Sequence, residues 1–168
     1  MDATPTPICP WPRRTATLWS ISHRRSRSRR PTLADVFPEK KIFSYRRFDD
    51  FAPVKSEFEA SEIAFLLPHQ LAFLPENFVD LFVNISSLHE MRQDQIEYFF
   101  ASIYRLVKPG GYFYLKAWRT SKIPLENAII REQDYPFDNW ETVYRRTPKV
   151  QTQFFEKLAR KPLSVDAQ

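Results

Sequence analysis

Glycine is unusually scarce in this sequence. The 168 residues include two glycines, Gly110 and Gly111, and both stand in one Lys-Pro-Gly-Gly turn. Loops that wrap around a phosphate or a nucleotide need several glycines close together, because the backbone must approach the ligand and adopt positive φ. No stretch of this sequence can form such a loop. The sequence therefore excludes the glycine-rich mode of cofactor binding within its own residues.

Cysteine, histidine and long apolar runs are also scarce. Cys9 is the sole cysteine, so neither a disulfide framework nor a cysteine metal cluster can form within the chain. The three histidines show no pair at metal-ligand spacing; His69, for instance, follows Pro68 without a neighbouring ligand, and we expect no metal site. No apolar run approaches the roughly 18 residues of a membrane span. By default we expect a cytoplasmic protein.

Positive charge is concentrated at the amino terminus. Residues 1–31 contain seven arginines and one acidic residue, whereas residues 32–168 contain 18 basic and 19 acidic residues. The proline, serine and arginine content of residues 1–31 predicts a disordered tail. A nuclear address, an RNA-binding patch and a transit peptide are alternatives to a plain solvated tail. Since the rest of the chain is nearly neutral, we expect nucleic-acid binding only through this tail.

The most informative stretch runs from Phe78 to Trp118. Phe78–Ile85 is a short apolar segment that predicts a strand, and Tyr112–Trp118 predicts a second one. Between them, apolar residues recur at helical spacing over Arg92–Val107, and the Lys-Pro-Gly-Gly turn ends that helix. A strand, a crossover helix and a strand of these lengths form a βαβ unit, which builds a parallel sheet. The predicted fold class is α/β.

Other elements flank this unit. Before it we expect strands at Lys40–Phe48 and Ile63–Leu67, a loop or short helix over Asp49–Glu62, and a helical turn at Gln70–Leu74. After it we expect a short helix over Leu125–Arg131, then a β-hairpin formed by Trp140–Arg146 and Val150–Phe154, and a frayed end at residues 161–168.

Polar side chains follow both strands of the βαβ unit. Ligands of open parallel sheets bind beyond the carboxyl ends of the strands. That rule nominates one group after the first strand and a second group at the end of the second strand: Asn84, Ser86, Ser87, His89 and Glu90, then Lys116 and Trp118.

These residues admit a functional and a structural interpretation. His89 titrates near neutrality and is suited to remove a proton from a hydroxyl group, with Glu90 to orient it. The structural alternative is that Ser86 or Ser87 satisfies backbone groups at the helix start, with His89 partly buried in the loop. By the same logic, Lys116 and Trp118 either contact a substrate or are an exposed lysine and a core tryptophan.

Several short segments in and around this region resemble those of a known protein family. The segments FLLPHQLAFLP, NISSLHEM and YFYLKAW, and a closing W-x-x-V-Y…FFE, resemble the sugar O-methyltransferases, a family of class I S-adenosylmethionine-dependent methyltransferases. The resemblance runs from about Phe37 to Arg160. It implies a Rossmann-like sheet whose fourth strand begins at Asp80 and which ends in an antiparallel pair, within a domain portion spanning residues 32–160.

The resemblance also implies a function. The implied reaction is methyl transfer from S-adenosylmethionine to a hydroxyl of a sugar or sugar conjugate. His89 is then the general base, Asn84 and Ser86 lie toward the cofactor, and four residues lie toward the substrate: Glu90, Ser87, Lys116 and Trp118.

The missing glycine-rich loop departs from the family pattern. We therefore expect the chain to carry only the later strands of the domain, as a fragment or as a gene model that begins too late, and to bind cofactor weakly or not at all. An open sheet edge, where strands are missing, favours self-association. The alternative function is that of a catalytically inactive remnant that serves as a protein-interaction module.

Overall fold

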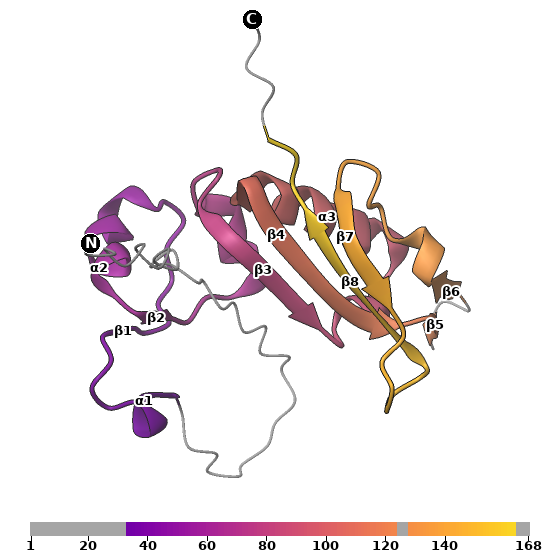
Figure 1. Ribbon diagram of the computed structural model, residues 1–168. Helices are drawn as coiled ribbons and strands as arrows, with labels where there is room; N and C mark the ends of the chain where they lie inside the picture. The colour runs from indigo at the N-terminus through magenta and orange to yellow at the C-terminus, as the bar shows by residue number, and fades with distance from the viewer. Residues whose placement is uncertain (1–32, 124–127, 164–168) are drawn as a thin grey trace, which may run out of the picture.

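The protein is described by a computed structural model that covers residues 33–123 and 128–163, so the predicted tail at residues 1–31 lies outside the described residues (Figure 1). Its centre is a four-stranded sheet in the order β3-β4-β8-β7. The strands are β3 (Val79–Ile85), β4 (Val107–Trp118), β7 (Glu141–Arg146) and β8 (Phe154–Arg160). β3 and β4 run parallel, whereas β8 is antiparallel to both of its neighbours. The predicted α/β fold, with an antiparallel pair at its end, is confirmed.

Helix α3 (Gln93–Leu106) connects β3 to β4 and lies behind the sheet in Figure 1. Its apolar stripe buries four residues against the sheet: Ile96, Phe100, Ile103 and Leu106. The Phe100 ring meets the β4 ring of Phe113 edge-on, with the ring centroids 5.3 Å apart, and Phe137 closes over both rings. Such aromatic pairs add to the stabilisation from buried area. The βαβ unit predicted from the sequence is therefore the core of the molecule.

The Lys-Pro-Gly-Gly turn lies inside β4 rather than between helix and strand as predicted. The helix ends at Leu106, and β4 begins at once with Val107. Val79 pairs with Val107, but two residues later Leu81 pairs with Tyr112, so the turn forms an irregularity in the ladder. Gly110 has φ of 77°, and a Cβ on Gly111 would lie 2.9 Å from the Asp80 carbonyl oxygen. The two glycines therefore allow β3 and β4 to approach each other here.

The region before β3 is less regular than predicted. It contains α1 (Leu33–Val36), η1 (Ala52–Val54), α2 (Lys55–Ala60) and η2 (Pro68–Phe73), and the helices near the predicted positions 49–62 and 70–74 are present. However, the two predicted strands are reduced to a parallel pair of two residues each, β1 (Ile42–Phe43) and β2 (Ile63–Ala64).

Buried Gln70 explains the shortening. Its Nε2 donates to the Arg46 carbonyl oxygen at 3.0 Å, and its Oε1 accepts from the Leu67 N–H at 2.9 Å. Just beyond the paired residues of β1 and β2, a backbone carbonyl group and a backbone N–H group thus bind the Gln70 side chain instead of each other's strand. The side chain is fully buried, so these two bonds also tie the amino-terminal segment to η2.

Two predictions after β4 are wrong. Ala128–Arg131 is not helical but forms strand β6, antiparallel to β5 (Thr120–Ile123), followed by η4 (Glu132–Asp134); residues 124–127 lie outside the description. Side chains alternate here, with Ile129 exposed and Ile130 buried, which is the period of a strand. The final hairpin is confirmed, but its second strand begins at Phe154, where the predicted one ended, because the buried residues come later.

The predicted frayed end is also wrong for its first residue. The Lys161 N–H donates to the Gly111 carbonyl oxygen at 2.8 Å. Its Nζ donates to the carbonyl oxygens of Tyr104 and Val107, at 2.8 and 2.9 Å, and to Asn77 Oδ1 at 3.0 Å. A cation at the carboxyl end of α3 also complements the helix dipole. No helix in the described part of the chain has both the length and the apolar character needed to cross a membrane.

Replacing Lys161 with methionine tests this anchor. Lys161→Met leaves the helix-end carbonyls without their charged donor, so we expect the free energy of unfolding to fall by about 2 kcal/mol or more. Urea denaturation followed by circular dichroism measures it. Lys122→Met, at an exposed position of β5, is the matched control and should change stability little. Equal losses in the two variants would show that Lys161 is not an anchor.

Candidate functional site

A sharp turn places the candidate residues after β3. Ser86 has φ of 56°, which only a few non-glycine residues adopt, and its N–H donates to the Lys116 carbonyl oxygen at 2.8 Å. The Asn84 amide donates to Ser87 Oγ at 2.7 Å. The chain then enters η3 (Leu88–Glu90), which lies at the carboxyl ends of β3 and β4. This is the edge of the sheet that the sequence predicted for ligand binding.

His89 packs between two aromatic rings. Its imidazole stacks on Trp118, with ring centroids 5.7 Å apart and planes 28° apart, and meets Phe154 edge-on at 6.2 Å. It is 6% exposed, and its Nδ1 has no hydrogen-bond partner among the described residues. Burial lowers the His89 pKa, and the nearby Glu90 carboxylate opposes this effect. The imidazole is therefore neutral near pH 7, the form that accepts a proton.

Lys116 and Trp118 complete this cluster from β4. Trp118 is 42% exposed although its ring stacks on His89. Lys116 Nζ lies 5.4 Å from the Phe154 ring centroid, donates to Gln151 Oε1 at 2.7 Å, and is 3.9 Å from Glu156 Oε1. We call these four residues (His89, Lys116, Trp118 and Phe154) the aromatic cluster. It joins a proton acceptor, a cation and an exposed indole.

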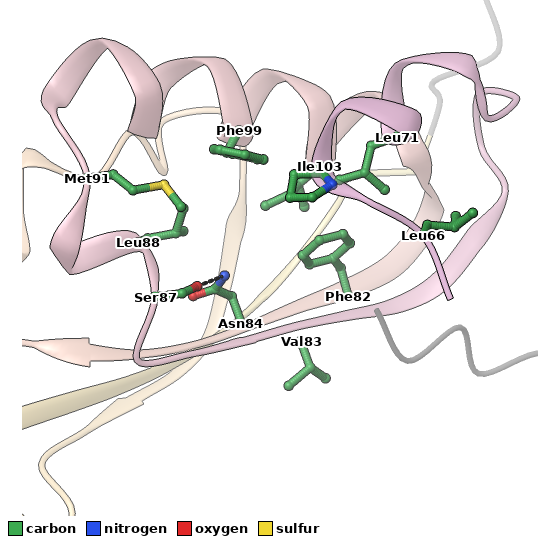
Figure 2. Close-up of a pocket in the computed structure, with 11 residues that line it drawn as sticks. Leu66, Leu71, Phe82, Val83, Asn84, Ser87, Leu88, Met91, Phe99 and Ile103 are labelled. Atoms are coloured by element: carbon green, nitrogen blue, oxygen red, sulfur yellow. Dashed lines mark hydrogen bonds between the residues drawn. The ribbon is translucent and has the colours of Figure 1, made fainter. Parts of the chain in front are cut away.

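The predicted residues Asn84 and Ser87 face elsewhere. They form the polar end of a cavity of about 40 Å³ between β3, α3 and η2 (Figure 2). Most of its lining is apolar, and includes Leu66, Leu71, Phe82, Leu88, Met91 and Phe99. Asn84 Oδ1 is buried and has no hydrogen-bond partner in the part of the chain that the structure describes. The structure thus separates the predicted residues into the aromatic cluster and this cavity, and leaves Ser86 and Glu90 exposed beside them.

Three residues near the site escaped the sequence analysis. Phe154, Gln151 and Glu156 come from β8 or the turn before it, some 35 residues or more beyond the strands that carry the other groups. Their antiparallel pairing, with Phe154 opposite Trp118 and Glu156 opposite Lys116, creates the neighbourhood. The sequence analysis placed Gln151 and Phe154 in the last strand and Phe154 and Glu156 in the FFE segment of the resemblance, but it did not predict the register that sets them opposite Trp118 and Lys116.

Part of the chain is similar to a known family of domains. Residues 55–115 match the family model of a methyltransferase domain. The family implies S-adenosylmethionine as the cofactor and a methyl acceptor as the substrate. The match covers β3, α3 and most of β4, which are also the elements that position the candidate site. No curated protein matches the sequence.

Several solved structures are similar to the chain. One is a candidate type 11 methyltransferase from Sulfolobus solfataricus, at 18% identity and a TM-score of 0.48, covering 81% of this chain and 93% of that one. Another is a SAM-dependent methyltransferase from Methanosarcina mazei, at 16% and 0.47, covering 62% and 69%. A third is 1,6-didemethyltoxoflavin-N1-methyltransferase from Burkholderia thailandensis, at 15% and 0.49, covering 72% and 60%.

The described residues do not fit the whole cofactor. Pockets for small molecules and cofactors usually measure about 300–1,000 Å³, whereas the cavity beside Asn84 measures about 40 Å³. Both glycines lie near the start of β4, at the opposite end of the strand from η3. What the residues offer is an unpartnered amide oxygen and a hydroxyl at the end of an apolar cavity. No group of three or more potential metal ligands occurs within residues 33–123 and 128–163.

The burial of His89 gives a testable pH dependence. Because burial lowers its pKa in the folded chain, folding favours the neutral imidazole, and stability present above pH about 6.5 decreases as the pH falls toward the folded-state pKa. Trp118→Ala uncovers the ring, so we expect the His89 pKa to rise toward 6.5. Titration of the His89 Cε1 proton by NMR measures both values. A wild-type His89 that titrates at or above 6.5 would contradict the described burial.

Proposed function

We propose that this chain provides the acceptor side of an S-adenosylmethionine-dependent O-methyltransferase that acts on a hydroxyl of a sugar or sugar conjugate. One observation supports it above the others. A buried, neutral imidazole with an unpartnered Nδ1 stacks on an exposed tryptophan at the carboxyl ends of two parallel strands. Sugars offer an apolar ring face and hydroxyl groups together, which suits an aromatic surface next to polar groups.

Three residues of the aromatic cluster, Trp118, His89 and Lys116, have a place in this proposal. A sugar lies beside the exposed part of Trp118, on the side of the indole from which a hydroxyl can reach His89, and His89 takes the proton of the hydroxyl that accepts the methyl group. Lys116 retains donors beyond its bond to Gln151, and these suit a sugar oxygen. Exposed Glu90 and half-buried Ser87 are further candidates for binding hydroxyls.

Toward the cofactor, Asn84 is the better supported of the two predicted residues. Its Oδ1 is buried and unpartnered, so a ligand donor that reached it would remove the cost of an unsatisfied buried acceptor. Ser86 is exposed, and its positive φ turns the backbone at the strand end. Because the described residues do not fit the whole cofactor, we assign no further step to it.

A second candidate function is that of an inactive remnant that serves in protein interaction. The size of the cavity favours it, since about 40 Å³ is far below the volume of a cofactor pocket. The position of both glycines, away from η3, favours it too.

Methyl transfer from labelled S-adenosylmethionine, at millimolar concentration, to a panel of free sugars and nucleotide sugars separates the two functions. His89→Gln should lower kcat by about 10²–10⁴-fold because the proton acceptor is lost, with a smaller effect on KM for the sugar. Trp118→Leu should mainly raise that KM. His69→Gln, at an exposed histidine outside the aromatic cluster, is the control.

Two results would overturn the acceptor-side proposal. One is methyl transfer that His89→Gln leaves unchanged. The other is a folded wild-type chain that transfers no methyl group to any sugar and whose tryptophan fluorescence no sugar alters; that result favours the interaction module.

A further inference from the structure

The two edges of the sheet differ in charge. β7 forms one edge; all six of its residues are exposed, and they include Glu141, Arg145 and Arg146. β3 forms the other edge, and it carries no charged residue from Leu81 to Ile85. Native proteins protect exposed strand edges with charged side chains, because the free N–H and C=O groups would otherwise pair with another strand. β7 has that protection, and β3 lacks it.

The free backbone groups of β3 can be assigned. The Ser86 N–H donates to the β4 residue Lys116, and the N–H and C=O groups of successive residues alternate between the two edges of a strand. The groups of Leu81, Val83 and Ile85 therefore point away from β4. No described strand pairs with this edge. Ile85 is 57% exposed, and Leu81 and Val83 are half-buried.

We propose that a second copy of this chain pairs with the free edge of β3, antiparallel and about a twofold axis at Val83. In this register Leu81 faces Ile85 of the other copy, and Asp80 faces Ser86, so the two carboxylates do not meet. The three outward residues of each copy then exchange about six hydrogen bonds.

The register and the sheet order explain why the occupant is a second copy. The segment from Leu81 to Ile85 carries no charge, four of its five residues are apolar, and it is complementary to itself in this register. Pairing joins two four-stranded sheets into one, with the charged β7 strands at both outer edges. A twofold contact of this kind uses the same surface on both copies and is closed, so the assembly stops at a dimer.

Sedimentation velocity of the full chain over a range of concentrations tests the proposal. We expect a monomer–dimer equilibrium. Val83→Pro removes an outward N–H without removing a bond to β4, and proline is tolerated at strand edges for that reason. It should weaken the dimer by about fivefold to a hundredfold. Val83→Ala, which keeps the N–H, is the matched control and should dimerise nearly as the wild type does.

If Val83→Pro does not fold, a second variant, Ile85→Lys, and amide hydrogen exchange of the wild type still test the proposal. Ile85→Lys places a charge on the exposed part of the edge, and it should also weaken the dimer. In the dimer the amides of Val83 and Ile85 should be protected from exchange, and dilution should remove the protection. A folded wild-type chain that is monomeric at every concentration would overturn the proposal. A dimer that survives Ile85→Lys without protection of these amides would overturn it as well.

Discussion

The parallel pairing of β3 with β4 is the constraint on which the rest of the structure depends. Because both strands run in the same direction, the chain must cross from the end of one to the start of the other, and α3 makes that crossing over one face of the sheet. The pairing also places both carboxyl ends at one edge. The turn at Ser86 and the last residues of β4 therefore meet there, which brings His89 onto Trp118.

The site that results is asymmetric. On the acceptor side, the imidazole, the ammonium group and the indole lie together, and they are held by Phe154 of β8 and by Gln151 in the turn before it. On the cofactor side, the residues provide Asn84 and a small apolar cavity, and the glycines that a cofactor loop requires lie at the other end of β4. The segment that matches the methyltransferase family model contains β3, α3 and most of β4, and the same three elements position the residues of the proposed chemistry.

The sequence predicted the elements whose signal is local and periodic. The βαβ unit followed from apolar spacing, and the strand-end rule identified His89 and Trp118 as members of one edge. The prediction from sequence was wrong where tertiary contacts override the local preference of the chain. Gln70 binds backbone groups just beyond the first two strands and so shortens them. Ile129 and Ile130 alternate between exposed and buried, as in a strand, within a segment whose sequence also suits a helix. Lys161 lies in the segment that was expected to fray, but its side chain is bound to the end of α3. The division between aromatic cluster and cavity depends on the direction of η3, which no spacing reveals.

Calorimetric titration of S-adenosylmethionine into the folded full-length chain tests the central claim, that these residues provide the acceptor side of a methyltransferase site without its cofactor loop. The account predicts binding no tighter than about 1 mM, since a single amide oxygen and a small cavity supply few contacts. Saturable binding at micromolar concentration, with one cofactor per chain, would contradict it. That result would show that the cofactor site is complete in this chain.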